Sequence, residues 1–127
     1  MGPEHPNLAP TLNGLGVVFR EMSRYDDAGA HFRRALNILE TAVGSDHPNV
    51  AFVLNDLALL RVAEGRNSEA EPLYARALTI REKTLDPEHP DLATSLENYA
   101  ALLRQTARAD EAERMEARAK AIRAKSE

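Results

Sequence analysis

The sequence predicts an all-α protein, a right-handed α-solenoid built from three antiparallel helix pairs. The first observation behind this prediction is a repeat of 42 residues, marked by the pairs His5-Pro6, His47-Pro48 and His89-Pro90. The second is that each block of 42 residues carries two stretches with the apolar spacing of a helix, separated by turn residues. One helix pair cannot bury its apolar face alone, whereas stacked pairs can, so a regular repeat of this kind is typical of a solenoid.

The repeat register divides the chain into blocks 2–43, 44–85 and 86–127, which we interpret as one domain spanning residues 1–127. Five columns of identical small or aliphatic residues keep the same offset in all three blocks. These columns are Ala9/Ala51/Ala93, Leu12/Leu54/Leu96, Ala28/Ala70/Ala112, Ala35/Ala77/Ala119 and Ile38/Ile80/Ile122. We expect them to face the core, with the alanines allowing close approach between helices.

The first helix of each block is expected at residues 6–22, 48–64 and 90–106. In the middle block the spacing i, i+4, i+7, i+8 of an amphipathic helix is carried by Val50, Leu54, Leu57 and Ala58. Pro48 stands in the first turn, where the missing N–H of proline costs nothing. Gly65 is expected to end this helix in a left-handed conformation.

The second helix of each block is expected at residues 26–42, 68–84 and 110–125. Ser68 and Glu71 have the spacing of a capping box, in which the serine would cap the helix N-terminus. Asp26 and Asp110 are the matching caps, and Asp110 with Glu113 would form another box. Pro87 and Pro90 separate the second block from the third.

The third block replaces apolar residues of its second helix by charged ones. The replacements are Phe32 and Tyr74 by Glu116, Leu36 and Leu78 by Lys120, and Leu39 by Arg81 and then Arg123. These positions would pack against a following repeat, whereas the inner stripe Ala112, Met115, Ala119 and Ile122 is kept. A helix with one apolar stripe and a charged outer face predicts that the third block acts as a C-terminal cap.

Composition excludes several classes of function. The chain has no cysteine, so a disulfide scaffold, a thiolate metal site and a cysteine nucleophile are excluded. A formal charge of −4 gives no general attraction to nucleic acid or to an anionic membrane. No apolar run approaches the roughly 18 residues of a membrane-spanning helix, and the first residues have no apolar signal core. We therefore expect a cytoplasmic protein that binds neither nucleic acid nor membrane.

The histidines predict turns rather than a metal centre or an active site. His5, His47 and His89 lie in different repeats, about 10 Å apart on stacked helices, whereas zinc–nitrogen bonds are about 2 Å long. Each His-Pro pair is interpreted as shaping the turn into its helix. The chain also lacks a nucleophile–base spacing, a glycine-rich phosphate loop and an HExxH motif. We expect no catalysis, no cofactor and no metal.

The pattern within each pair resembles a known repeat family. Leucine, then Leu-Gly or Leu-Ala, then Ala-x-x-x-aromatic-x-x-Ala is carried in the first block by Leu12, Leu15, Gly16, Phe19, Ala28, Phe32 and Ala35. The second block repeats it with Leu54, Leu57, Ala58, Ala70, Tyr74 and Ala77. This pattern resembles the tetratricopeptide repeat, and the period of 42 residues is similar to that of the kinesin light chain subtype. The resemblance covers essentially the whole chain.

This resemblance implies a peptide-binding groove on the concave side, lined by the first helices of the repeats. The implied groove residues are Asn13, Val17, Arg20, Phe52, Asn55, Leu59, Val62, Glu97, Asn98, Ala101 and Arg104. In similar proteins the asparagines grip the backbone of an extended peptide, because a carboxamide has both a donor and an acceptor. The alternative for Asn13 and Asn55 is a hydrogen bond to the neighbouring repeat.

Two functions follow as expectations. The first is a non-enzymatic interaction module that holds a peptide segment of a partner protein. The second is a sensor or self-assembly segment of a larger signalling protein. The helix at 7–22 keeps apolar columns, among them Leu8, Leu15 and Met22, where a preceding repeat would pack. Either the chain is cut from a longer array, or two chains form a homodimer through the N-terminal repeat, and we predict the homodimer.

Overall fold

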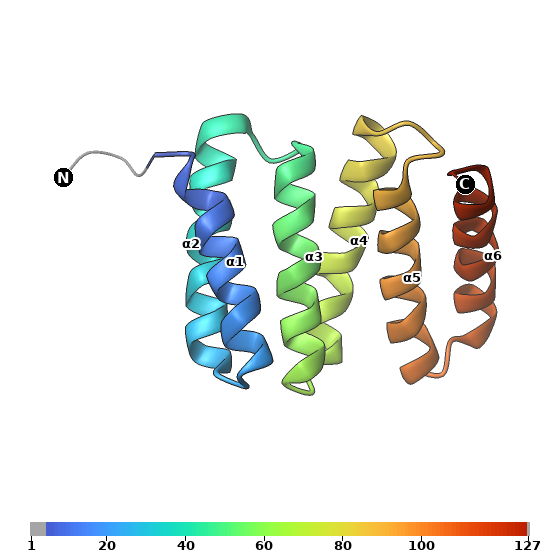
Figure 1. Ribbon diagram of the computed structural model, residues 1–127. Coiled ribbons are helices and arrows are strands. Elements are labelled where there is room, and N and C mark those ends of the chain that lie inside the picture. Colours follow the sequence, from blue (N-terminus) through green and yellow to red (C-terminus); the bar gives the residue numbers. More distant parts are fainter. Residues whose placement is uncertain (1–4, 127) are drawn as a thin grey trace.

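The computed structural model describes residues 5–126, with side chains to residue 125, and folds into six α-helices arranged as three antiparallel pairs (Figure 1). The helices are α1 (Leu8–Glu21), α2 (Tyr25–Val43), α3 (Pro48–Ala63), α4 (Asn67–Thr84), α5 (Pro90–Gln105) and α6 (Ala109–Ser126). No strand occurs within this described range. The prediction of an all-α helical repeat solenoid is confirmed.

The three pairs stack in a row, as Figure 1 shows. Each helix packs against the other member of its own pair, and α2 and α4 pack against the first helix of the next pair. The backbones of the first helices α1, α3 and α5 also approach their neighbours in the row, whereas α2 and α4, and α4 and α6, are joined by long side chains, through the ion pairs Arg76–Glu40 and Arg118–Glu82. The first helices are therefore closer together than the second ones, and they form the inner side of the curved row.

The core consists of the repeated columns. None of the side chains in the five columns is more than 6% exposed, from Ala9 and Leu12 in the first repeat to Ala119 and Ile122 in the third. Phe32 and Tyr74 are also buried, at 0% and 2% exposure. The inward register predicted by the period of 42 residues is thus confirmed in all three repeats.

The histidine of each His-Pro pair caps a turn with its own ring. Nδ1 of His47 accepts a hydrogen bond from the backbone N–H of Asn49 at 3.0 Å, and Nδ1 of His89 accepts from Asp91 N–H at 3.0 Å. His5 makes the same contact with Asn7 N–H at 3.1 Å. Pro48 and Pro90 are the first residues of α3 and α5. The imidazoles of His47 and His89 therefore satisfy a first-turn N–H of α3 and α5, and that of His5 satisfies the N–H of the residue before α1.

The turn inside each pair is closed by one residue in the left-handed region. Gly65 has φ +78, as predicted, and the equivalent Ser23 and Ala107 have φ +60 and +62. The next residue in each repeat then donates its N–H back to the first helix, as Arg66 does to the carbonyl of Arg61 at 2.7 Å. This arrangement satisfies carbonyls at the end of the first helix and reverses the chain within three residues.

The predicted capping boxes are wrong. The helices α2, α4 and α6 begin one residue earlier than expected, so Asp26, Ser68 and Asp110 lie inside their first turns. The cap positions of α2 and α4 are Arg24 and Arg66, neither with a side-chain cap hydrogen bond. The left-handed turn thus places an arginine, whose side chain cannot accept a hydrogen bond, at each of these two cap positions.

Glu71, the other member of the expected box at Ser68, makes contacts between repeats instead. It accepts a hydrogen bond from the Tyr99 hydroxyl at 3.0 Å and pairs with Arg108. The hydrogen bond from Arg108 holds the pKa of the Glu71 carboxyl below its usual value. This glutamate therefore joins α4 to α5 and to the turn before α6.

Candidate binding groove and inter-repeat contacts

Two asparagines lie at equivalent positions on the inner helices. Asn13 on α1 and Asn55 on α3 are 8% and 6% exposed. The amide nitrogen of Asn13 donates to Oδ2 of Asp56 on α3 at 3.0 Å, so the hydrogen bond to the neighbouring repeat exists for this residue. The Oδ1 atoms of both asparagines are buried and have no hydrogen-bond partner within the described chain. Buried polar atoms nearly always have a partner, so the two free acceptors distinguish these asparagines from the other buried polar residues.

Asp56 links the two inner helices, and the sequence reasoning missed it. Its carboxylate also lies 3.9 Å from Nη1 of Arg20, whose side chain is 21% exposed. This nitrogen is a third buried polar atom that lacks a hydrogen-bond partner within residues 5–126. Burial raises the pKa of the Asp56 carboxyl, and the Asn13 hydrogen bond and the Arg20 charge offset this only in part. The sequence did contain a signal for this role, because Asp56 is the one acidic residue in the mostly apolar helix 48–63.

A pocket of about 270 Å³ opens between α1 and α3. Its lining is largely apolar, with the amides of Asn13 and Asn49 as its polar groups; the lining residues are Ala9, Pro10, Asn13, Gly14, Leu39, Asn49, Phe52 and Val53. Phe52 is 53% exposed, which is unusual for a large aromatic side chain. The pocket therefore joins a predicted aromatic groove residue to a predicted asparagine.

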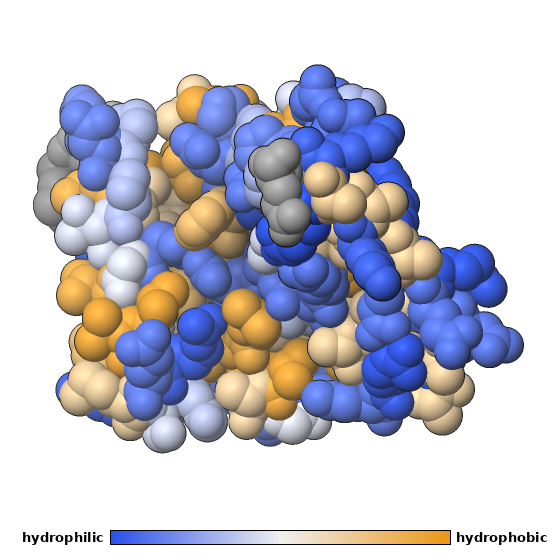
Figure 2. Space-filling model, turned by 45° about the vertical axis from the view of Figure 1, so that its right-hand side comes forward, coloured by the Kyte–Doolittle hydropathy of each residue, from blue (hydrophilic) through white to orange (hydrophobic). Residues whose placement is uncertain are grey.

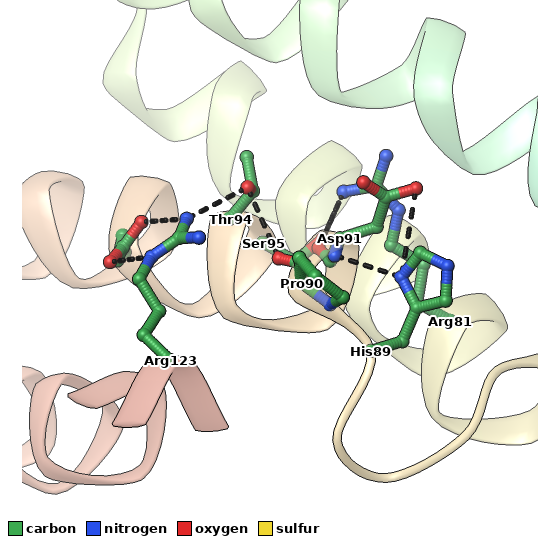
Figure 3. A network of polar contacts seen from close by, with 8 residues as sticks. Arg81, His89, Pro90, Asp91, Thr94, Ser95 and Arg123 are labelled. Atoms are coloured by element: carbon green, nitrogen blue, oxygen red, sulfur yellow. Dashed lines mark hydrogen bonds and ion pairs between the residues drawn. The ribbon is translucent and has the colours of Figure 1, made fainter. Parts of the chain in front are cut away.

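At the next boundary between repeats, Arg81 stands in the column of Leu39. Its side chain is 3% exposed, and Nη1 donates to the Asp91 carbonyl at 3.0 Å and to Oγ of Ser95 at 2.9 Å (Figure 3). The guanidinium carbon lies 6.0 Å from the centroid of the Phe52 ring. A charged side chain is therefore accommodated in this inter-repeat column, because Ser95 and a helix carbonyl accept hydrogen bonds from the guanidinium.

The predicted groove charges of the third repeat are bound within that repeat. Glu97 accepts from Nε and Nη2 of Arg123 at 2.8 and 2.7 Å, and Arg123 also donates to Thr94 at 3.1 Å (Figure 3). Arg104 donates from Nε to Glu116 at 2.7 Å. The structure therefore does not bring Glu97 and Arg104 into the cluster of Asn13, Arg20 and Asp56.

The remaining predicted groove residues are divided between packing and the surface. Val17, Leu59 and Val62 are half-buried and pack against the core clusters. Asn98 is half-buried and Ala101 is exposed. On the face drawn in Figure 2, hydrophobic side chains gather over the first two repeats, whereas the surface towards the C-terminal helix is mainly hydrophilic.

The described residues contain neither a cluster of metal ligands nor a membrane-spanning helix. Between residues 5 and 126 no three side chains of the metal-binding types come together. The helices of this part of the chain are also too short or too polar to cross a membrane.

Comparisons with known proteins identify the repeat. The family model for the tetratricopeptide repeat matches residues 7–83 and 49–125. The crystal structure of BtubC (BKLC) from P. vanneervenii superposes with a TM-score of 0.86 at 28% identity, over 94% of this chain. The crystal structure of a kinesin light chain-like protein from Podosopora anserina, with nearly identical TPR-like repeats, superposes with a TM-score of 0.87 at 25% identity, over 98% of this chain.

The chain is shorter than these relatives. It spans 48% of the BtubC chain and 59% of the Podosopora anserina chain. A comparison with curated protein sequences gave no significant match. The family model nevertheless covers residues 7–125 of the chain in two overlapping matches. The chain belongs to the tetratricopeptide repeat family, and its repeats are of the kinesin light chain type.

Proposed function

We propose that this chain is an interaction module that holds an extended peptide segment of a partner protein in its concave groove. Tetratricopeptide repeats are generally protein–protein interaction modules and are typically not enzymes. The observation that carries the proposal is the pair of buried, unpartnered amide oxygens on Asn13 and Asn55. An extended peptide presents backbone N–H donors whatever its side chains, so it suits acceptors of this kind.

The pocket beside Asn13 gives the proposed peptide an anchor. Phe52 and Leu39 offer apolar walls to an aliphatic or aromatic side chain, while Arg20 would attract an acidic residue of the peptide. Arg104 is less suited to this second role because Glu116 already binds it. The other proposed contacts with the peptide are Val17, Leu59, Val62, Glu97, Asn98 and Ala101.

Asn55→Ala tests the asparagine contact. This substitution removes the amide oxygen that would accept a hydrogen bond from a backbone N–H of the peptide, so we expect partner binding to weaken by about 1–3 kcal/mol. The fold should change little, since the amide oxygen has no partner in the described chain. Partners would first be identified by pull-down and sequencing, and the affinity of a synthetic peptide from the partner would then be measured by calorimetry.

The matched control for this experiment is Asn37→Ala, on the exposed surface of α2. It makes the same chemical change outside the groove, so it should leave the affinity unchanged. Equal affinities for Asn55→Ala and the parent protein would contradict the proposal. A large drop in the melting temperature of Asn55→Ala would show instead that the asparagine column is structural.

We also propose that the third helix pair, the block 86–127, acts as the C-terminal cap of the three repeats. Glu116 and Arg123 stand where the preceding repeats have larger or buried side chains, and both are held in ion pairs with α5. Lys120, in the column of Leu36 and Leu78, is exposed. These charges would lose water if another repeat covered them, and the cost would oppose further stacking.

The second candidate function is a sensor or self-assembly segment of a larger signalling protein. It is favoured by the large apolar side chains that α1 leaves exposed. Coding sequence for a further domain beside this chain would support it. For either function we propose a cytoplasmic setting and a protein partner rather than nucleic acid or membrane, because the formal charge of −4 favours neither.

A further inference from the structure

The two asparagine oxygens without a partner lie one repeat apart, and this spacing restricts the conformation of the proposed peptide. Asn13 on α1 and Asn55 on α3 hold equivalent positions, and the backbones of these two helices approach each other on the inner side. The amide nitrogen of Asn13 reaches Asp56, the neighbour of Asn55, at 3.0 Å. Packed helices have axes about 8–10 Å apart, so a peptide that crosses both must turn N–H groups to one side at about this interval.

Two extended backbone conformations differ in this interval. In a β-strand each residue advances about 3.4 Å and alternate residues face the same side, so N–H groups on one side recur at about 6.8 Å and then about 13.6 Å. A polyproline II helix advances about 3.1 Å per residue with three residues per turn, so its N–H groups on one side recur at about 9.3 Å. Only the last value falls within the separation of packed helices. Residues i and i+3 of a polyproline II segment therefore match the two acceptors.

The third member of the asparagine column takes no part in this match. The equivalent position on α5 is Glu97, a carboxylate that accepts hydrogen bonds from Nε and Nη2 of Arg123 at 2.8 and 2.7 Å. It stands where the first two repeats have an uncharged amide. The match to N–H donors therefore covers the first two repeats, and the unit recognised there is four residues long, from i to i+3.

The pocket between α1 and α3 suits the two residues in the middle of this unit. Residues of both helices line it, and the half-exposed ring of Phe52 forms one wall. Most of the other lining side chains are apolar, among them Ala9, Pro10 and Val53. Proline has an apolar ring and no N–H, and proline-rich segments dock on aromatic-lined grooves as polyproline II helices. Prolines at i+1 and i+2 would therefore fill the pocket without leaving a donor unpaired.

Arg20 supplies the complementary donor. A polyproline II segment has no internal hydrogen bonds, so its carbonyls remain free to accept one. Nη1 of Arg20 is buried and lacks a hydrogen-bond partner within residues 5–126, and it lies beside the carboxylate of Asp56 that Asn13 contacts. We propose, as an extension that rests on the peptide-binding function, that the groove binds a polyproline II segment with prolines at i+1 and i+2 and other residues at i and i+3.

Two synthetic peptides of identical composition test the spacing. The first consists of four Leu-Pro-Pro triplets, so its N–H groups recur at every third residue. The second consists of two Leu-Leu-Pro-Pro-Pro-Pro blocks, in which no two leucines are three residues apart. Each peptide carries a fluorescent dye, and fluorescence anisotropy measures its binding to the parent chain. We expect the triplet peptide to bind at least about tenfold more tightly than the block peptide, and equal affinities would overturn the proposal.

Removal of the donors or of the groove contacts tests how the triplet peptide is held. N-methylleucine in place of each leucine removes the N–H groups and keeps the prolines, so we expect an affinity at least about tenfold lower. Asn55→Ala and Phe52→Ala should each weaken the triplet peptide at least about fivefold, whereas the control Asn37→Ala should not. Circular dichroism would verify that each variant is folded. Binding that survives N-methylation, or both groove substitutions, would overturn the proposal.

A peptide from a partner found by pull-down separates this proposal from the proposed function. Proline substituted at its positions i or i+3 should abolish binding, whereas proline at i+1 or i+2 should not. If the partner's peptide requires Asn55 but tolerates proline at i and i+3, the polyproline II proposal is wrong and the groove function stands. If Asn55→Ala leaves the affinity for the partner's peptide unchanged, the groove function is contradicted, and the proposal that rests on it is overturned as well.

Discussion

The two boundaries between repeats are built from equivalent positions of the repeat but differ in the polarity of the side chains that occupy them. Between the first and second repeats, Leu39 is 7% exposed and lines the pocket of about 270 Å³. Between the second and third, Arg81 takes the same column, is 3% exposed and bonds to Ser95 and to the Asp91 carbonyl. The repeat therefore fixes where a side chain lies, whereas its neighbours decide whether an aliphatic or a charged side chain is tolerated there.

This difference shows that inter-repeat columns change in matched sets. Ser95, which receives the Arg81 hydrogen bond, stands in the column of Val53, which packs with Leu39 in the first core cluster. The pairs Leu39/Val53 and Arg81/Ser95 are thus an apolar and a polar solution for the same contact. Leu39 and Val53 line the pocket beside Phe52, so we place the anchor of the proposed groove at the first boundary.

The largest expected effect on stability comes from disrupting the polar pair Arg81/Ser95. Arg81→Ala would leave the hydroxyl of Ser95, a residue that is 1% exposed, without the donor of its hydrogen bond and would open a cavity between α4 and α5. We expect the free energy of unfolding to fall by about 2–4 kcal/mol. Urea denaturation followed by circular dichroism would measure the change.

The double variant Arg81→Leu with Ser95→Val is the sharper control. It installs the apolar pair of the first boundary at the second, so its stability should return to within about 1 kcal/mol of the parent. A double variant as unstable as Arg81→Ala would mean that the two boundaries differ in backbone geometry and not only in side-chain chemistry.

Sequence reasoning predicted the fold well because the fold depends on repeated local patterns. The columns through Leu12 and Ala28 are buried in every repeat as expected, and Gly65 adopts the left-handed conformation assigned to it. The predicted cap at Ser68 was wrong because the left-handed residue Gly65 reverses the chain within three residues, so α4 already begins at Asn67 and Ser68 lies in its first turn.

The candidate site was harder to predict because it depends on contacts between repeats. Column analysis placed Asn13 and Asn55 on the inner helices, but it could not show that Asp56 would reach across to Asn13 and Arg20. It also could not show that Glu97 and Arg104 would be bound by side chains of α6. A long charged side chain can reach several oppositely charged groups, and the sequence alone does not show which of them lies within hydrogen-bonding distance.

A smaller effect on stability is expected at one position of the first helix, where the first repeat has a smaller residue than the other two. Gly16 stands where α3 and α5 have Ala58 and Ala100, and a Cβ at Gly16 would lie 2.6 Å from Cε1 of Phe32. Gly16→Ala should therefore lower the free energy of unfolding by about 1–3 kcal/mol, although alanine is the better helix former. Thermal melting would measure the loss.

Gly14→Ala is the matched control for this change, since its Cβ would meet nothing within 4 Å. It should be neutral or stabilise the chain by up to about 1 kcal/mol through helix propensity. If Gly16→Ala melted at the same temperature as the parent, the Phe32 ring would have to shift freely, and the tight packing of the first repeat would be disproved.

The smallest expected effect has the opposite sign. Asp56 stands in the column of Asn98, so Asp56→Asn converts the first boundary towards the second. The asparagine can still accept the Asn13 hydrogen bond while removing a buried charge whose pKa is raised mainly by desolvation. We expect the variant to be more stable than the parent at pH 7, by less than about 1 kcal/mol.

The pH dependence of this difference identifies its cause. Because the folded state raises the pKa of Asp56, ionisation of this group destabilises the fold as pH rises through its titration range. The advantage of Asp56→Asn should therefore be full at pH 7 and fade as pH falls below about 4, where the carboxyl is protonated in both states. Other carboxyls titrate in both proteins, so the difference between their urea midpoints at pH 7 and pH 3.5 isolates Asp56. A variant less stable than the parent at pH 7 would show that Arg20 and Asn13 more than offset the burial. Asp56 would then be a structural link between α1 and α3 rather than a charge kept, at a cost in stability, beside the proposed peptide site.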